Sequence, residues 1–522
     1  MIKRIVPIIL FFCIVAVAAF LRLWHLGGVP ISPNWDEVAY GYNAYSILHT
    51  GKDEYGVTYP FILRSFNDYR PALSAYTMMP SIALFGLTTF ALRLPSALFG
   101  IAAVIGTFFL TKELLALQNA SQKRKTYLSL LVMFLLAISP WHIQFSHYAH
   151  EGNLALTFCI FGLLFFLKGL KNPHWYILSA FFYGLSLHTY QSPRLFVPVF
   201  LIGLVIIFRK RLQEQRKRLV IPIIVGMLFL LPFFLLILNH QGSQLSARFS
   251  ATSIFSQEKS ESLEENSFTK FLYGYVSHFS PRWLFITGDN DRHHAPSTGL
   301  LYLWEAPFLL LGLYLLLRMK TPFRSVVLLI LLVSPLTAAV TTEVPHALRT
   351  LSFLPALQIV TGLGIERIFH RIRKYSMQRQ FAITIAMLCI IGFFILQYLH
   401  LYYFQMNHEF SRNWQFGYEY AVNYAQEHRK EYKKIVVDNS LEQPYIFFLF
   451  YTRFDPKKYL ETGGTRNGEN QAFDIFEFRE VEWNKENHDG SNLYILSPRQ
   501  EHGEALHTIR YFDNSEAFVI TE

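Results

Sequence analysis

The chain has 522 residues, of which 52% are hydrophobic, 16% aromatic and 16% charged. A soluble globular chain carries about 25% charged residues, and a chain this apolar cannot bury its surplus in a water-soluble core. Together with the mean hydropathy of +0.25, this surplus implies a bilayer and excludes soluble cytosolic enzymes, disordered chains and disulfide scaffolds. The net charge of +10 does not indicate a nucleic-acid partner, because the charges lie between apolar runs.

The N-terminus carries Lys3 and Arg4, followed by an apolar run over residues 5–23. Many further apolar segments follow, so we interpret this run as an uncleaved transmembrane helix rather than a signal peptide. The other candidate spans are residues 91–111, 126–140, 152–167, 175–190, 195–208, 219–239, 300–317, 325–340, 350–366 and 381–404. A polytopic α-helical membrane protein of about eleven spans is therefore expected, with allowance for short or broken helices.

Lysine and arginine residues cluster in alternate connections between these spans, for example at residues 112–125, 209–218 and 367–379. The other short connections hold Arg194 and Arg349 alone. The positive-inside rule then places the N-terminus in the cytoplasm and the chain beyond residue 404 outside it. We expect a multi-pass protein of the plasma (inner) membrane.

Residues 1–404 are expected to form the transmembrane domain, with large outer loops at residues 25–90 and 240–299. Charges become frequent after residue 404, where residues 405–522 are predicted to form a small extracytoplasmic α/β domain. The expected elements are a helix at 411–432 and strands at 434–438, 472–482, 492–496 and 507–520. Residues 444–451 are rich in aromatic side chains and remain ambiguous between helix and strand.

The three cysteines, Cys13, Cys159 and Cys389, each lie inside an apolar run. A disulfide or metal framework is therefore not expected. We interpret all three as buried packing residues.

The first outer loop contains Asn34-Trp-Asp36-Glu37, which has the spacing of a capping box. A short helix over residues 36–49 is expected to lie on the membrane surface. Asp36 and Glu37 would occupy its first turn, where the helix dipole favours ionised carboxylates. Simple helix capping is the alternative explanation for both acids.

The same loop later presents Arg70 ahead of a proline, and the next outer connection ends with Glu151. Glu151 lies at the edge of an apolar span, where a carboxylate is costly unless it is paired or functional. A solvated interfacial charge is the alternative for Glu151. We interpret His147 and His150 as interfacial polar residues rather than metal ligands, because no third ligand is indicated.

Arg194 and Arg349 lie on the outer side, where the positive-inside rule disfavours them. A compensating anion is therefore expected, and arginine forms bidentate pairs with phosphate. A structural ion pair with Glu343 or Asp36 is the alternative.

The order of these features resembles the GT-C superfamily of lipid-carrier-dependent glycosyltransferases. In particular, it is similar to bacterial relatives of the dolichyl-phosphate-mannose protein mannosyltransferases and of the aminoarabinose–lipid A transferases. The resemblance covers about residues 1–370 and rests on the order and common sidedness of the motifs. The tail lacks a Trp-Trp-Asp signature, which disfavours an asparagine-linked oligosaccharyltransferase.

The resemblance implies site residues by position. Asp36 and Glu37 match the catalytic acidic pair, and Glu151 matches the family's second acid. Arg70-Pro-Ala-Leu matches a lysine-proline turn that contacts the lipid phosphate, with arginine in place of lysine. Regions that line the donor pocket contain Tyr190, Arg194 and Arg349.

The implied reaction transfers a sugar from a polyprenyl-phosphate monosaccharide to a protein, lipid or glycan of the cell envelope. Inversion at the anomeric carbon is expected, with Asp36 as the base. We expect no cofactor and no essential metal, because a lipid phosphate monoester needs less charge neutralisation than a nucleotide diphosphate. The partners are the donor lipid, the acceptor and the bilayer, without nucleic acid.

Two alternative functions are weighed against this one. A polysaccharide transporter would place charges in the middle of spans and often show related halves, whereas the acids here lie at span ends. An O-antigen ligase or polymerase would use one large late loop. The loop at 240–299 contains candidate residues for it, namely Arg282, Asp289, Asp291, Arg292, His293 and His294.

Overall fold

The computed structural model describes residues 2–255, 266–466 and 472–522. It divides into two compact units. Unit 1 contains Met1–Trp24 and Ser96–Leu401, and unit 2 contains His25–Pro95 and Tyr402–Glu522. This division differs from the predicted boundary at residue 404, because the first long loop groups with the C-terminal tail.

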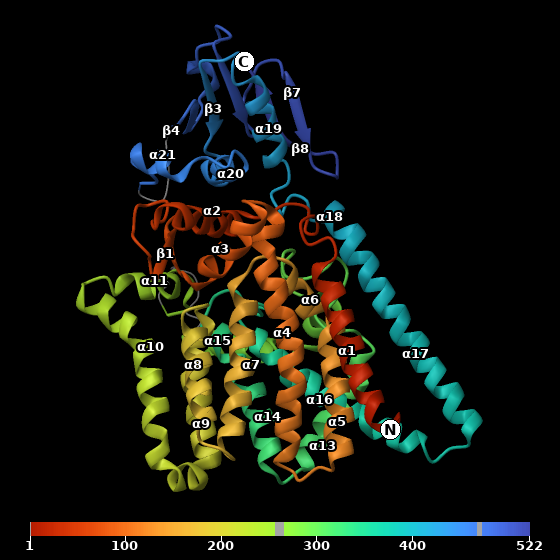
Figure 1. The fold of residues 1–522 in the computed structure, drawn as a ribbon. Coiled ribbons are helices and arrows are strands. Elements are labelled where there is room, and N and C mark those ends of the chain that lie inside the picture. Colours follow the sequence, from red (N-terminus) through yellow and green to blue (C-terminus); the bar gives the residue numbers. More distant parts are fainter. Residues whose placement is uncertain (1, 256–265, 467–471) are drawn as a thin grey trace. The chain divides into compact units, whose positions relative to one another are not determined.

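Unit 1 is helical, and most of its long helices lie with their axes roughly aligned, whereas α17 (Met377–His400) is tilted (Figure 1). Helix α4 (Thr89–Ala116) passes from unit 2 into it. The other helices are α1 (Ile2–Leu23), α5 (Gln122–Ile138), α6 (Pro140–His147), α7 (Glu151–Gly169), α8 (Trp175–Leu187), α9 (Ser192–Glu214), η1 (Arg216–Leu219), α10 (Val220–Leu238), α11 (Ser243–Thr252), α12 (Ser267–Ser277), η2 (Trp283–Thr287), α13 (Glu305–Arg318), α14 (Pro322–Val333), α15 (Leu336–Ala339), η3 (Leu351–Phe353), α16 (Leu354–Ile372) and α17 (Met377–His400).

Each of the predicted spans contains a helix, but the number of eleven membrane crossings is not confirmed. In the described part of the chain, seven helices are long and apolar enough to cross a membrane. The number rises to 8 if the bent pair α5 and α6 counts as one span. Helices α8 and α13 have 13 and 14 residues, fewer than the ~20 that cross a bilayer.

Helices α13 and α16 pack closely through two glycines. A Cβ atom at Gly312 would overlap the carbonyl oxygen of Val360, and one at Gly364 would overlap that of Phe308. Small residues at a helix crossing let two backbones approach, which is how apolar helices gain packing energy within lipid. We conclude that α13 belongs to the helical packing of unit 1 although it is short.

Unit 2 joins the first long loop to an α/β tail. The loop forms α2 (Trp35–Thr50), the hairpin β1 (Ile62–Ser65) and β2 (Asp68–Pro71), and α3 (Leu73–Phe85). The tail begins with η4 (Leu401–Gln405) and α18 (Met406–Glu409). It continues with α19 (Tyr418–His428), β3 (Lys434–Asp438), α20 (Pro444–Tyr451), α21 (Pro456–Glu461), β4 (Ala472–Phe473), β5 (Phe476–Arg479), η5 (Trp483–Lys485), β6 (Asn492–Leu496), β7 (His507–Arg510) and β8 (Glu516–Thr521).

The tail strands form one sheet in the order β4-β5-β3-β6-β8-β7. Strand β3 is parallel to β5 and β6, and the other pairs are antiparallel. The predicted strands fall on β3, β5, β6, β7 and β8, and the ambiguous residues 444–451 form the buried helix α20. The residues at 411–432 are helical over a shorter length than predicted, since α19 starts at Tyr418.

Hydrogen bonds explain why the tail groups with the loop. Tyr42 in α2 donates to the carbonyl oxygen of Phe454 at 3.2 Å, and the backbone N–H of Trp35 donates to Oε1 of Gln415 at 2.8 Å. Helix α2 also packs against α20 and α21. The tail therefore orders the segment that carries the predicted acidic pair.

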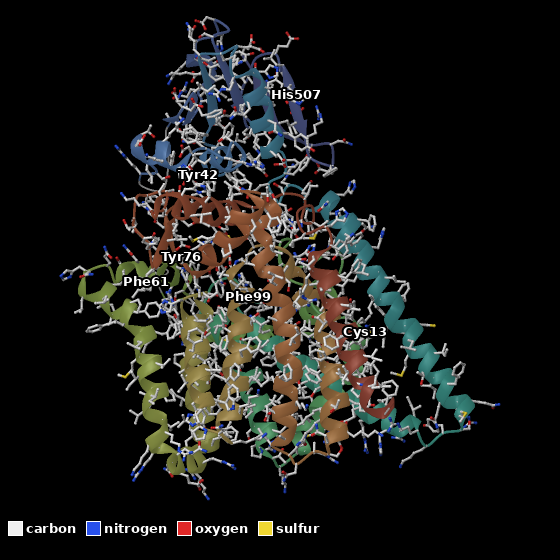
Figure 2. The ribbon with its side chains drawn as sticks, viewed as in Figure 1. Cys13, Tyr42, Phe61, Tyr76, Phe99 and His507 are labelled. Carbon is white, nitrogen blue, oxygen red and sulfur yellow. The ribbon has the colours of Figure 1, made fainter. Side chains whose placement is uncertain are left out.

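The interpretation of the cysteines is wrong for two of the three. Cys159 is buried, but Cys13 and Cys389 are exposed, and Cys13 lies on the surface of α1 (Figure 2). Both exposed cysteines lie on candidate membrane spans. An apolar run therefore indicated contact with lipid rather than burial within the protein.

Candidate active site

The capping box that begins α2 is present as predicted. Oδ1 of Asn34 accepts hydrogen bonds from the N–H groups of Asp36 at 2.9 Å and Glu37 at 3.1 Å. Oε2 of Glu37 accepts in return from the N–H of Asn34 at 3.1 Å. The predicted helix over residues 36–49 corresponds to α2, Trp35–Thr50. Asn34 and Glu37 form the capping box with their side chains. Helix capping therefore does not explain why Asp36 has a carboxylate at this position.

Glu37 forms a buried ion pair with Arg93 at the start of α4. Nε and Nη2 of Arg93 donate to the two carboxylate oxygens at 2.9 and 3.2 Å, and both side chains are almost fully buried. Arg93 also donates to the carbonyl oxygens of Leu26, Pro30 and Ser32. Because both carboxylate oxygens are engaged, this geometry favours a structural role for Glu37.

Asp36 faces Arg70, which the hairpin of β1 and β2 presents opposite Leu63. Nη1 of Arg70 lies 2.9 Å from Oδ2 of Asp36. The second oxygen, Oδ1, is buried and has no hydrogen-bond partner within the described residues. The structure thus brings the predicted base and the predicted phosphate ligand together, and it leaves one carboxylate oxygen able to accept a proton.

A second acidic pair, Asp53 and Glu54, was missed by the sequence reasoning. Glu54 is fully buried, and its carboxylate accepts from Asn43 at 2.8 Å and from Thr465 of the tail at 2.6 Å. Burial raises the pKa of Glu54 to about 7, although these hydrogen bonds lower it in part. Burial likewise raises the pKa of Asp53 to about 6.

The raised pKa of Glu54 makes stability depend on pH. The folded chain holds the proton up to about pH 7, whereas the unfolded chain releases it near 4.5, so the free energy of unfolding falls as the pH rises between these values. The difference corresponds to roughly 3 kcal/mol. Glu54→Gln removes this contribution. We expect the variant to be more stable than the wild type at pH 7.5, with a flatter profile from pH 5 to 7, in thermal unfolding of the purified protein.

Thr465→Val is the matched control, because it removes a hydrogen bond to Glu54 but leaves the titrating carboxyl in place. It should be less stable than the wild type and retain the pH dependence. Identical pH profiles for Glu54→Gln and the wild type would show that Glu54 does not titrate in this range.

In unit 1, Glu151 begins α7 beside two aromatic rings. Oε2 of Glu151 lies 3.2 Å from Nδ1 of His150, and the His150 ring meets the ring of Tyr190 edge to face at 5.6 Å. Glu151 is 4% exposed. The alternative of a solvated interfacial charge therefore does not describe Glu151, whose carboxylate is buried and paired.

Tyr190 and Arg349 line a common small pocket. Gly152, which follows Glu151, also lines it, and most of the remaining wall is apolar. The other lining residues are Ala155, Leu156, Cys159, Ser192, Pro193, Phe196, Leu348, Leu351 and Ser352. An apolar cavity with one arginine and one tyrosine suits an anionic group attached to a hydrocarbon chain.

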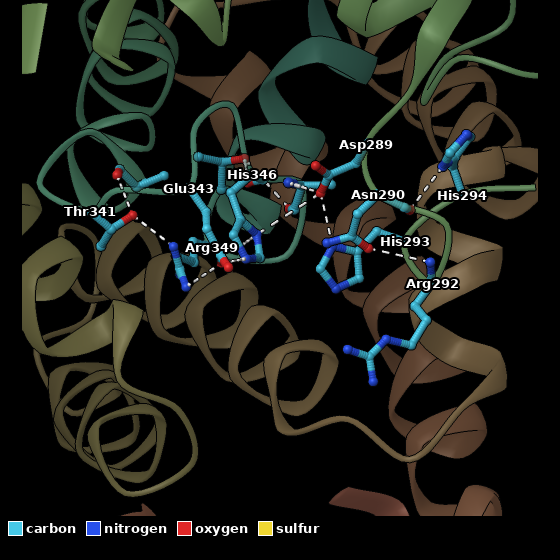
Figure 3. A network of polar contacts seen from close by, with 12 residues as sticks. Asp289, Asn290, Arg292, His293, His294, Thr341, Glu343, His346 and Arg349 are labelled. Atoms are coloured by element: carbon cyan, nitrogen blue, oxygen red, sulfur yellow. Dashed lines mark hydrogen bonds and ion pairs between the residues drawn. The ribbon is translucent and has the colours of Figure 1, made fainter. Parts of the chain in front are cut away.

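Arg349 is held by polar contacts within its own loop (Figure 3). Its guanidinium donates to Oγ1 of Thr341 at 2.7 Å and to Oε2 of Glu343 at 3.1 Å. The ion pair with Glu343 is the alternative considered from the sequence. Glu343 is 69% exposed, so solvent weakens the pair and the arginine can exchange this partner for another anion.

Arg194 is not among the residues that line this pocket. Its guanidinium packs over the ring of Phe233 at 5.0 Å, and it donates to the carbonyl oxygen of Leu187 at 3.3 Å. Its neighbours Ser192 and Pro193 line the cavity. The predicted role of Arg194 in donor binding therefore stays a prediction.

The chain is similar to proteins of the GT-C glycosyltransferase type in part of its sequence and in its fold. Residues 69–237 match the family model described as dolichyl-phosphate-mannose-protein mannosyltransferase. A search of curated protein sequences finds no match.

Several solved structures are similar in fold, among them the following three. ArnT from Cupriavidus metallidurans in the apo state has a TM-score of 0.56 at 13% identity, over 94% of this chain and 93% of ArnT. ArnT bound to undecaprenyl phosphate has a TM-score of 0.56 at 12% identity, over 98% and 97% of the two chains. The archaeal oligosaccharyltransferase AglB from Archaeoglobus fulgidus, in complex with an inhibitory peptide and a dolichol-phosphate, has a TM-score of 0.50 at 13% identity, over 86% of this chain and 64% of AglB.

The predicted resemblance to the GT-C superfamily is thereby confirmed, and the chain is an integral membrane protein with an ArnT-like fold. At 12–13% identity, the similarity to these solved structures supports the fold and does not establish the activity. The donor, the acceptor and the roles of individual residues therefore belong to the proposal that follows.

Proposed function

We propose that this protein is a glycosyltransferase of the plasma (inner) membrane. It moves a sugar from a polyprenyl-phosphate monosaccharide to an acceptor hydroxyl at the outer face, with the N-terminus in the cytoplasm. The observation that carries the proposal is the pair of Asp36 and Arg70 at the N-terminus of α2. The complexes of ArnT with undecaprenyl phosphate and of AglB with dolichol-phosphate support a lipid-phosphate donor.

In the proposed reaction, Oδ1 of Asp36 accepts the proton of the acceptor hydroxyl. The acceptor oxygen attacks the anomeric carbon, and the bond from that carbon to the phosphate oxygen breaks on the opposite side. The leaving oxygen keeps the electron pair, so the products are an inverted glycoside and the polyprenyl phosphate. Arg70 stabilises the developing negative charge on the phosphate.

Tyr190 and Arg349 are proposed to bind the donor through the cavity in unit 1. The Arg349 guanidinium supplies the positive charge, and the apolar side chains beside it are proposed to contact the first part of the prenyl chain. Glu151 is proposed to hold His150 and the adjacent cavity wall in place rather than to react.

A deletion strain tests the function as a whole. Lipid-linked sugars and surface glycans are isolated from the strain and from its complemented parent. We expect one polyprenyl-phosphate sugar to accumulate and one glycan to lose a residue. If both pools match those of the parent, the proposed activity is refuted.

Arg70→Ala is expected to weaken the binding of undecaprenyl phosphate to the purified protein by about 10- to 100-fold, because a charge-assisted hydrogen bond is worth about 1.5–3 kcal/mol. The binding is measured by titration in detergent or nanodiscs. Arg64→Ala is the matched control from the same hairpin, where Arg64 donates to the carbonyl oxygen of Phe66. An affinity of Arg70→Ala equal to that of the control would remove Arg70 from the donor site.

A further inference from the structure

Two loops of unit 1 meet at a cluster of one carboxylate and two imidazoles. Asp289 and His293 follow η2, and His346 lies between α15 and η3 (Figure 3). One ligand atom from each of the three residues lies within 4.8 Å of the other two. The three side chains are 7–11% exposed.

We propose that Asp289, His293 and His346 form a binding site for a transition-metal dication, with Zn²⁺ as the representative ion. Carboxylate oxygen and imidazole nitrogen are ligands that Zn²⁺ prefers. The proposal is independent of the proposed glycosyl transfer, because none of the three residues has a part in that reaction.

The distances between the ligand atoms suit a metal ion. Oδ2 of Asp289 lies 2.9 Å from Nδ1 of His293 and 4.0 Å from Nδ1 of His346. In a tetrahedral site with bonds of 2.0–2.1 Å to nitrogen, ligand atoms lie about 3.3 Å apart. Small side-chain rotations therefore bring all three atoms into one coordination shell, and a fourth position stays open to water.

The surroundings of His346 also point to a metal. Its Nδ1 faces Asp289, and on the other side its Nε2 lies 3.7 Å from the carboxylate of Glu343. A metal-binding histidine commonly directs its second nitrogen to a carboxylate, which orients the ring. The closest hydrogen bond to the His346 ring among the described residues comes from the N–H of Arg349, at 3.5 Å, so this buried imidazole has no strong partner.

A backbone hydrogen bond also holds the Asp289 carboxylate in position. Its Oδ2 accepts a hydrogen bond from the backbone N–H of Ala347 at 2.6 Å, which fixes the carboxylate as hydrogen bonds do for ligating carboxylates. Without a metal, the same oxygen accepts from Nδ1 of His293 at 2.9 Å. Zn²⁺ bound at Nδ1 takes the place of that hydrogen bond, and the neutral His293 ring then carries its one proton on Nε2.

The consequence of the site is a link between the two loops. A bound ion would tie the segment after η2 to the turn that contains His346 and Arg349, and so hold Arg349 at the cavity that it lines. The role is structural. The expectation of a reaction without an essential metal at the sugar is therefore unaffected.

The test measures zinc rather than turnover. The full chain is purified without a polyhistidine tag, stripped with a chelator and titrated with ZnCl₂. We expect one Zn²⁺ per chain, with X-ray absorption showing nitrogen and oxygen ligands near 2.0–2.1 Å and the scattering of two imidazoles. His346→Asn and Asp289→Asn should each weaken binding by more than about 100-fold, since even outer-shell changes cost 10–100-fold.

His294→Asn is the matched control, because His294 follows His293 directly but its Nδ1 contacts the carbonyl oxygen of Asn290. It should bind Zn²⁺ like the wild type. Asp289→Asn retains an acceptor for the Ala347 N–H, so this variant is expected to fold, and a loss of zinc would then not reflect unfolding. The proposal is overturned if the wild type binds no zinc, or if His294→Asn loses zinc as strongly as His346→Asn does.

Discussion

The Asp36→Asn variant is expected to lose about 10²–10⁴-fold in turnover, which is the usual contribution of a general base. Asparagine keeps the shape of the side chain and can still accept a hydrogen bond from Arg70, but it cannot take a proton. Asn34 and Glu37 form the capping box, so α2 should begin normally in the variant. Turnover is measured with purified protein and lipid-linked donor, alongside the affinity for the donor.

Asp68→Asn is the matched control for this experiment. Oδ2 of Asp68 lies 3.7 Å from Nε of Arg70 on the same hairpin, so its loss perturbs the same arginine without touching the proposed base. It should retain most of the activity. If Asp36→Asn turned over at the rate of the control, Asp36 would not be the base, and Glu37 and Glu151 would be examined next.

Local features of the site were predictable because their causes are local. The capping box depends on two residues three positions apart, and it was visible in Asn34 and Glu37. The strands β3 and β6 were visible for the same reason, as short apolar runs between turns. The apolarity of the sequence also located the helices of unit 1 that were predicted as spans. It did not settle how many of them cross the membrane, because α8 and α13 are short helices that depend on their packing.

The partners of the site residues were not predictable, because they come from distant parts of the chain. Arg93 pairs with Glu37 across the first loop, and Thr465 of the tail binds Glu54. One signal for Arg93 was present, since it lies inside the predicted span at residues 91–111, where a charge is costly unless it is paired. No local pattern indicated that His346 would meet Asp289.

The stability of unit 2 should be sensitive to the loss of either partner of the buried pair Arg93 and Glu37. Arg93→Met is expected to lower the free energy of unfolding by about 3–5 kcal/mol, because it leaves a buried carboxylate without its partner. It also removes the donor from the carbonyl oxygens of Leu26, Pro30 and Ser32. Thermal unfolding of the purified protein gives the measurement.

Arg64→Met is the control, because Arg64 lies in the same unit and is half-buried rather than enclosed. It should unfold close to the wild type. The double variant Glu37→Gln with Arg93→Met should recover part of the loss, since the uncompensated charge is gone while the three carbonyl oxygens still lack their donor. A Glu37→Gln variant that is stable but inactive would contradict the structural role of Glu37 and would indicate that Glu37 takes part in the reaction. If Glu37→Gln instead loses stability and keeps its turnover per folded molecule, then the acidic pair divides its roles, with Glu37 holding the loop and Asp36 carrying the chemistry.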